Sequence, residues 1–227
     1  MLTSQRSGTE SVSKPIAKLV GLGGALAISA QLMAVAIQSP SYWWLGWLTL
    51  LPLFLAIRVL SPLRALAAGS FWGACFCVLS LIGGEPAFAP TLSSFVLLSA
   101  IPGIYAGLGS IITRRVGFSP LMLGLGWVGV EFALHPLALH NGLLAGTQGD
   151  GWVVRVVGNV AGYVLVAFLV AYVTAALLSV LTQVYAAARS LLPLGGAGRV
   201  APKAYLSESA FHLLHFIGSL QPRAPPA

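Results

Sequence analysis

The sequence predicts an all-α integral membrane protein: a bundle of six transmembrane helices followed by a short C-terminal amphipathic helix. Of the 227 residues, 57% are hydrophobic and only 7% are charged, whereas roughly 25% are charged in an ordinary soluble domain. The mean hydropathy is +0.90. So few charges do not cover a globule of this size, which excludes a water-soluble enzyme. The lipid bilayer is therefore the expected solvent for most of the chain.

Six apolar stretches of about 20 residues define the predicted spans, and Pro or Gly residues separate them. The second stretch is interrupted by Pro52 and ends at Arg58. The predicted domains are a polar N-terminal tail over 1–15, a transmembrane domain over 16–188, and a cytoplasmic linker with an amphipathic helix over 189–227. The six predicted spans are 19–37, 42–59, 65–82, 92–112, 121–139 and 158–184.

The basic residues predict the orientation of the bundle. If six spans alternate, eleven of the twelve Lys and Arg residues fall on one side, and only Arg155 falls on the other. Cytoplasmic loops carry such an excess, so both termini are predicted to be cytoplasmic. The basic residues stand singly or in pairs along the chain. We therefore read the net charge of +7 as a topology signal and predict no nucleic-acid partner.

The C-terminal segment differs in composition from the spans. Residues 193–203 are rich in Pro and Gly and predict a linker, while residues 206–220 predict a short amphipathic helix. At about 1.5 Å per residue, this helix is too short to cross the bilayer. We expect it to lie on the inner interface or in a groove of a partner.

Glu131 is the only carboxylate inside a predicted span. Trp127 precedes it by four residues, so the indole and the carboxyl share one helix face. Burial of an ionisable group in hydrocarbon costs free energy unless the group is paired or hydrated. Glu131 is therefore a functional candidate by default. We favour a structural interpretation, in which the carboxyl bonds to a neighbouring segment. The polar side chains available as partners are Gln31, Tyr105, Gln148, Arg155 and Asn159.

The predicted outward loop over 140–157 gathers further polar residues, with His135 just before it. His135 and His140 are five residues apart across Pro136, so they do not share a regular helix face, and two His residues do not complete a zinc site. No Ser or Cys nucleophile stands beside them in the sequence. We assign no catalytic residue, metal or cofactor. The residues assigned to lipid or partner binding are Trp127, Glu131, His140, Asn141, Gln148 and Arg155.

Small residues four apart predict close helix packing. The pairs include Gly69 with Gly73 and Gly103 with Gly107. We expect these pairs to organise the bundle.

An ordered set of short motifs resembles the amino-terminal membrane domain of apolipoprotein N-acyltransferase over about residues 16–182. The order and spacing of the motifs carry this resemblance, because each motif alone is common in membrane helices. The motifs are Trp44-Leu45-Gly46-Trp47 with Leu51-Pro52-Leu53, Gly69-Ser70-Phe71-Trp72-Gly73, Tyr105-Ala106-Gly107-Leu108 with Arg114-Arg115, Trp127-Val128-Gly129-Val130-Glu131-Phe132, Gly146-Thr147-Gln148 and Gly162-Tyr163.

The chain also departs from the pattern of that family. Leu134 stands where the family has an Arg, His140-Asn141 replaces a Pro-Trp segment, and Gly146 replaces a Tyr. No residue matches the Glu-Lys-Cys triad of the family's nitrilase-like catalytic domain, because both cysteines lie in a span and all three lysines are predicted to be cytoplasmic. The resemblance therefore implies the membrane half of the architecture without its chemistry, in a bacterial inner membrane.

Three functions are consistent with these features. The favoured one is a non-catalytic subunit or scaffold, which packs membrane lipids and partner helices in a larger membrane assembly. The second is the membrane half of a split lipoprotein N-acyltransferase that works with a separate nitrilase-like chain. The third is a lipid-modifying enzyme that uses Glu131 and the His residues of the outer loop.

Overall fold

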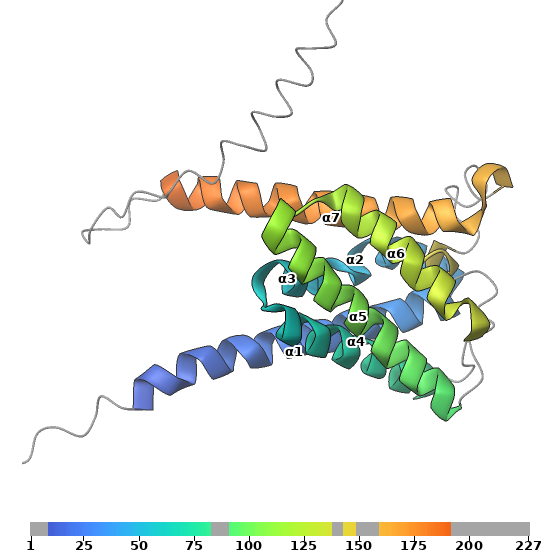
Figure 1. Cartoon of the computed structure of the whole chain (residues 1–227), viewed down its shortest axis with the longest axis horizontal. Coiled ribbons are helices and arrows are strands. Elements are labelled where there is room, and N and C mark those ends of the chain that lie inside the picture. The colour runs from blue at the N-terminus through green and yellow to red at the C-terminus, as the bar shows by residue number, and fades with distance from the viewer. Residues whose placement is uncertain (1–8, 83–90, 138–142, 149–158, 192–227) are drawn as a thin grey trace, which may run out of the picture. The chain divides into compact units, whose positions relative to one another are not determined.

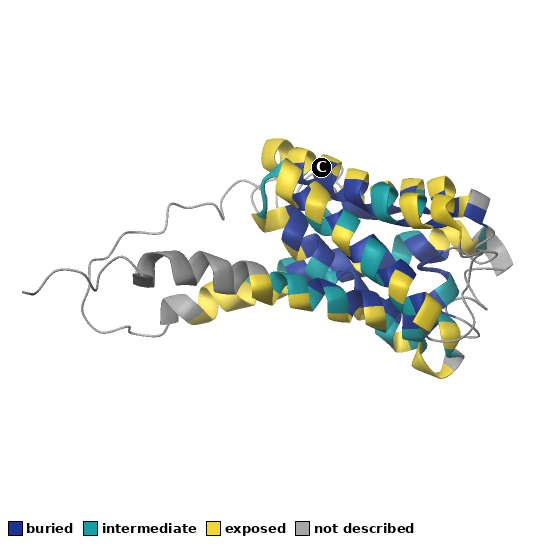
Figure 2. Ribbon diagram, turned by 90° about the horizontal axis from the view of Figure 1, so that it is seen from below, coloured by how far each residue is buried: buried dark blue, intermediate teal, exposed yellow. Residues whose placement is uncertain are grey.

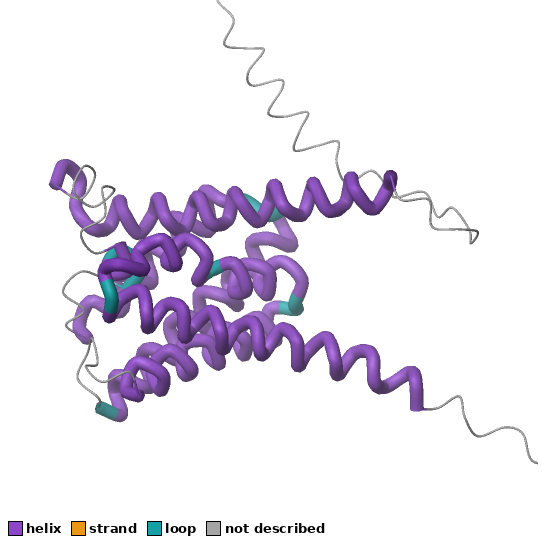
Figure 3. Tube along the Cα trace, turned by 180° about the vertical axis from the view of Figure 1, so that it is seen from behind, coloured by secondary structure: helices purple, strands orange, loops and turns teal. Residues whose placement is uncertain are grey.

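The computed structural model describes residues 9–82, 91–137, 143–148 and 159–191, and these residues form helices and short turns without a strand (Figures 1 and 3). The chain divides into two compact units, Met1–Ala186 and Ala187–Ala227, and the packing described below lies within the first. The predicted tail helix over 206–220 lies outside the described residues. The helices are α1 (Thr9–Gln38), η1 (Pro40–Leu45), α2 (Gly46–Thr49), α3 (Leu51–Val59), α4 (Pro62–Ile82), α5 (Leu92–Val116), α6 (Pro120–Leu134), η2 (His135–Leu137), η3 (Gly146–Gln148) and α7 (Asn159–Leu191).

The predicted all-α membrane bundle is confirmed. Five stretches in the described part of the chain are long and apolar enough to cross a bilayer. Their outward-facing side chains are largely apolar, with Leu63 77% and Val116 75% exposed, as expected of a surface solvated by lipid (Figure 2). The five stretches are Val20–Gln38, Ser41–Val59, Pro62–Ile82, Leu92–Val116 and Gly162–Ala188.

The predicted span over 121–139 differs from the structure. Helix α6 has 15 residues and ends at Leu134, where the chain continues as the 3-10 turn η2. At about 1.5 Å per residue, α6 is roughly 22 Å long, which is shorter than the ~30 Å hydrocarbon core. Pro136 accounts for this end, because it has no N–H group to continue the helical hydrogen bonds.

The second span is a succession of short helices rather than one continuous helix. The 3-10 helix η1 and helices α2 and α3 follow one another, and Leu50 between α2 and α3 has φ −91° and ψ −7°. Pro52 stands in the first turn of α3, where its missing N–H costs nothing. The interruption predicted at Pro52 is therefore confirmed.

Helices α4 and α5 pack side by side (Figure 1). A Cβ atom at Gly73 would collide with the Leu98 carbonyl oxygen, and one at Gly69 would collide with the Pro102 carbonyl oxygen. Gly103 faces the Ser70 side chain in the same way. The predicted role of these glycines in close helix packing is confirmed.

Helix α7 is attached to the second span by side-chain hydrogen bonds. Thr174 Oγ1 donates to the Trp47 carbonyl oxygen over 2.9 Å, and Arg58 donates to Thr182 Oγ1 over 2.7 Å. The first turn of α7 is interrupted at Gly162, which has φ +75° and ψ +171°, a conformation that glycine adopts readily. These bonds hold α7 against the interrupted span and close one side of the core.

Candidate functional site

The carboxyl group of Glu131 lies inside the first unit and accepts three hydrogen bonds. Glu131 is only 8% exposed and shares the buried face of α6 with Trp127. Trp127 Nε1 and the main-chain N–H of Leu144 donate to Oε1 over 3.0 and 2.7 Å, and the main-chain N–H of Leu143 donates to Oε2 over 2.5 Å. Both oxygen atoms therefore act as acceptors toward the protein itself.

The two main-chain donors belong to a buried turn that leads into the 3-10 helix η3, and we call this segment the 143–148 loop. Leu143, Leu144, Ala145, Thr147 and Gln148 are each at most 2% exposed. Backbone groups away from water must find partners inside the protein. The Glu131 carboxyl supplies those partners for the first two N–H groups of the loop. The Glu131 carboxyl therefore provides the hydrogen-bond acceptors that this buried, irregular backbone needs.

The rest of the 143–148 loop satisfies its own groups and reaches the second span. The Thr147 N–H and Oγ1 both donate to the Leu144 carbonyl oxygen, over 3.3 and 2.7 Å. Gln148 Nε2 donates to the Trp43 carbonyl oxygen over 3.2 Å and to Thr147 Oγ1 over 3.0 Å. A Cβ atom at Gly46 would collide with Thr147 Oγ1, so the loop lies directly against α2. Gln148 Oε1 is buried without a hydrogen-bond partner among the described residues.

An aromatic cluster joins the carboxyl to helices α4 and α5. The Trp127 ring meets the rings of Tyr105 and Trp72 edge to face, with centroids 5.4 and 6.1 Å apart. Trp72 stacks on Phe76 at 6.1 Å. Such pairs add about 0.5–1.5 kcal/mol beyond the burial of their area. The cluster therefore fixes the indole that bonds to Glu131.

The polar atoms of the same cluster bond to other helices. Trp72 Nε1 donates to Ser29 Oγ over 2.8 Å, and Ser29 Oγ in turn donates to the Thr49 carbonyl oxygen. Tyr105 Oη donates to the Leu123 carbonyl oxygen over 2.9 Å. These bonds cross between α4, α1 and α2, and between α5 and α6. The cluster thus connects these helices by hydrogen bonds as well as by apolar packing.

The structure brings three of the six predicted site residues into one network and leaves the other three undescribed. Trp127, Glu131 and Gln148 are connected through the 143–148 loop. His140, Asn141 and Arg155 lie outside the described residues. The role of the six residues in binding lipid or a partner stays a prediction. No group of three or more metal-ligating side chains occurs in the part of the chain that the structure describes.

None of the described polar side chains predicted as partners of Glu131 bonds to it, and Arg155 and the side chain of Asn159 lie outside the described part of the chain. Tyr105 and Gln148 bond to carbonyl groups elsewhere, and the described donors to the carboxyl are Trp127 and two main-chain N–H groups. The contact between Ser29 and Trp72 was not predicted from the sequence. Their pairing joins residues 43 apart in the chain, and no local pattern marks such a contact.

The fold and the site together define a multi-pass α-helical membrane domain, in which a buried carboxyl holds a buried loop. Residues 29–176 match the apolipoprotein N-acyltransferase N-terminal domain, and the chain belongs to this family. The resemblance predicted from the motifs is therefore confirmed. Comparisons with curated proteins and with solved structures found no match.

Proposed function

We propose that the chain is a non-catalytic membrane subunit or scaffold, which packs lipid and partner helices in a larger membrane assembly. The observation that carries this proposal is the state of Glu131, the one carboxyl inside the predicted spans. A carboxyl that acts as a general acid or base must lie within hydrogen-bond reach of its substrate. Both oxygens of Glu131 instead accept hydrogen bonds from the chain, and the side chain is 8% exposed. The group supports the fold.

The outward apolar surface supports the same proposal. Long stretches of α4, α5 and α7 expose large hydrophobic side chains. In a bilayer such faces contact acyl chains or the helices of other proteins, and small-residue rows allow close helix approach. A scaffold role needs these surfaces and no reacting group.

Isolation of the full chain from its membrane in a mild detergent, followed by mass spectrometry, tests the proposal. A stable assembly that contains no nitrilase-like chain is the expected result. Recovery of a nitrilase-like chain in a fixed ratio would contradict the scaffold function. The same recovery would support the second candidate, a split lipoprotein N-acyltransferase, which the family match to residues 29–176 favours.

We also propose that the domain resides in the inner membrane with both termini in the cytoplasm. Support comes from the eleven basic residues on one predicted side, which include Arg58, Arg114 and Arg115 at the ends of α3 and α5. Cysteine accessibility tests this in a background without Cys75 and Cys77. Ser93→Cys, at the start of α5, should react with an impermeant reagent from outside, and Val116→Cys only after lysis. The reverse pattern would overturn the orientation.

A further inference from the structure

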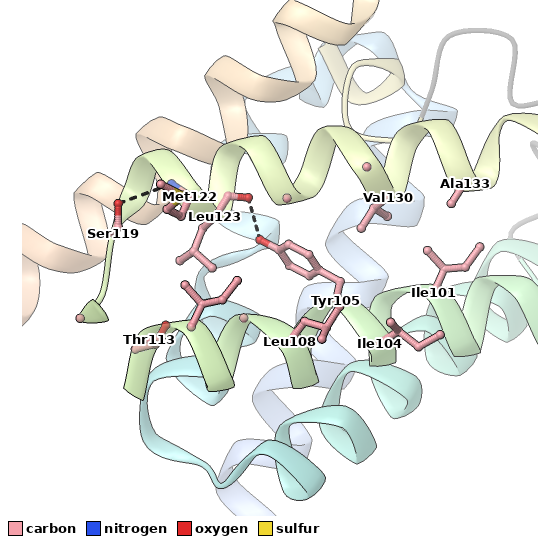
Figure 4. Close-up of a pocket in the computed structure, with 15 residues that line it drawn as sticks. Ile101, Ile104, Tyr105, Leu108, Thr113, Ser119, Met122, Leu123, Val130 and Ala133 are labelled. Carbon is pink, nitrogen blue, oxygen red and sulfur yellow. Dashed lines mark hydrogen bonds between the residues drawn. The ribbon is translucent and has the colours of Figure 1, made fainter. Parts of the chain in front are cut away.

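An open apolar groove of about 370 Å³ runs between helices α5 and α6 (Figure 4). Ile104, Leu108 and Ile112 line it from α5, and Met122, Gly126 and Gly129 line it from α6. A Cβ atom at Gly129 would meet nothing within 4 Å. Gly129 therefore leaves part of this space open, whereas Gly126 is in close contact with the Tyr105 ring.

The length of the groove fits one leaflet of a bilayer. On α5 its lining runs from Ile101 to Thr113, which is about 18 Å at roughly 1.5 Å per residue. Half of the ~30 Å hydrocarbon core is about 15 Å. A transmembrane helix of a partner would extend across both leaflets and would need a channel of about 10–12 Å diameter. The groove therefore fits an acyl chain that enters from one leaflet.

The polar end of the groove lies at the basic end of α5. Thr113 and Ser119 line the groove there, and Arg115 follows Ile112 by three residues and Leu108 by seven. These spacings place Arg115 in the same row of α5 as the apolar lining. Arg115 makes no hydrogen bond or ion pair within the part of the chain that the structure describes. Its charge is thus available at the level where a headgroup would lie.

The neighbouring arginines are engaged with the protein. Arg114 donates to the Leu60 carbonyl oxygen over 3.0 Å, on another side of α5. Arg58 lies over the Phe118 ring, 5.2 Å from its centroid, and donates to Thr182. Arg114 is therefore a matched control for Arg115, with the same charge at the same end of the same helix.

We propose that the α5–α6 groove binds one acyl chain of an anionic phospholipid, with Arg115 binding the headgroup phosphate. Basic side chains at the interfacial end of a cleft between membrane helices attract anionic lipid headgroups. The apolar lining gains by burying the chain's methylene groups. The proposal names a lipid class for the scaffold function. It rests on one part of that function, namely that the domain packs lipid. The test below measures lipid retention rather than assembly, so one proposal is able to fail without the other.

Native mass spectrometry of the purified full chain, titrated with phosphatidylglycerol or with phosphatidylcholine of the same acyl chains, tests the headgroup. Wild type should retain phosphatidylglycerol more strongly. Arg115→Gln should weaken this retention about fivefold, the effect of roughly one basic group at a membrane surface. Arg114→Gln should leave the preference in place. Equal weakening by the two variants would show that the protein attracts anionic lipid only through its overall positive charge. That result would overturn the proposed headgroup site.

Gly129→Leu tests the acyl-chain site, because Gly129 lines the groove and a Cβ atom there meets nothing within 4 Å, so the larger side chain takes up space in the groove. It should reduce retention of both lipids, whereas Gly24→Leu, at an exposed glycine of α1 with equally open surroundings, should not. Unchanged retention in Gly129→Leu would overturn the proposal. The proposal would also be overturned if Gly129→Leu no longer bound a second copy of the chain or another protein, because a helix would then occupy the groove in the wild type.

A measurement on the unaltered protein supplements the variants. Phosphatidylglycerol with a photoreactive group in its acyl chain should label the peptides that contain Leu108 and Met122. Labelling spread over the outer faces of α4 and α7, with none in these peptides, would contradict the proposal.

Discussion

The indole nitrogen of Trp127 donates a hydrogen bond to Glu131 Oε1 over 3.0 Å, one turn along the same helix. The bond orients the carboxyl so that it also accepts from the N–H groups of Leu143 and Leu144. The contact within α6 thereby positions the contacts between α6 and the 143–148 loop. The pair also explains why a carboxyl is tolerated within an apolar helix, since three donors inside the protein bond to its oxygen atoms.

Glu131→Gln should lower the free energy of unfolding by about 1–3 kcal/mol, because the amide NH₂ group would leave one buried donor unpaired. Glu131→Leu should cost at least twice as much, since it strands all three donors. Equilibrium unfolding in mixed micelles measures both. Phe132→Leu, on the exposed face of α6, is the control and should change stability by less than about 0.5 kcal/mol. Equal losses for Gln and Leu would contradict the account of the hydrogen bonds.

The hydrogen bond between Trp72 and Ser29 should appear as a coupling energy. Trp72→Phe removes the indole N–H and keeps an aromatic ring, and Ser29→Ala removes the acceptor. A double-mutant cycle should give a coupling of about 0.5–1.5 kcal/mol. Simple additivity of the two losses would show that the bond does not stabilise the contact between α1 and α4.

Gly73→Ala should separate α4 from α5, because the new Cβ atom would collide with the Leu98 carbonyl oxygen. The expected loss is about 1–3 kcal/mol, as for other overpacked sites. Gly21→Ala is the matched control, since a Cβ atom there meets nothing within 4 Å. Thermal unfolding of the detergent-solubilised protein compares them. By helix propensity alone, Gly→Ala inside a helix stabilises by up to about 1 kcal/mol, so Gly21→Ala should be neutral or stabilising. Unchanged or raised stability in Gly73→Ala would contradict the collision.

Truncation after Arg199 should leave a membrane-inserted and folded bundle. The removed residues belong to the unit Ala187–Ala227, whereas the carboxyl site belongs to the unit Met1–Ala186. Membrane fractionation and size-exclusion chromatography measure insertion and dispersity. Aggregation of the truncated chain would place the tail in the folded core. Loss of partner chains alone would support the predicted role of the tail in association.

The fold class could be predicted because it depends on composition and on apolar stretches, which are local properties of the sequence. The family could be predicted from the order of motifs such as Gly69-Ser70-Phe71-Trp72-Gly73. The shared face of Trp127 and Glu131 followed from helical spacing alone, and the structure confirms it. Each of these inferences needed no knowledge of how distant segments meet.

The partners of Glu131 could not be predicted for the opposite reason. Two of them are main-chain N–H groups, which every residue except proline carries, so the sequence does not distinguish Leu143 and Leu144 from other residues. The end of α6 at Leu134 was missed because an apolar stretch continues past Pro136, although the proline interrupts the helix. The α5–α6 groove was not predicted, because it depends on how two helices meet in space, which the sequence of neither helix specifies.

The central claim is that Glu131 holds the fold and carries no chemistry. The most direct test compares wild type with Glu131→Gln, each isolated with its partners. It measures, per folded molecule, the partner chains recovered and the acylation of a lipoprotein's amino terminus. The account predicts equal recovery and no difference in acylation between the two preparations. Acylation by the wild-type preparation, with complete loss in a folded and fully assembled Glu131→Gln variant, would contradict it.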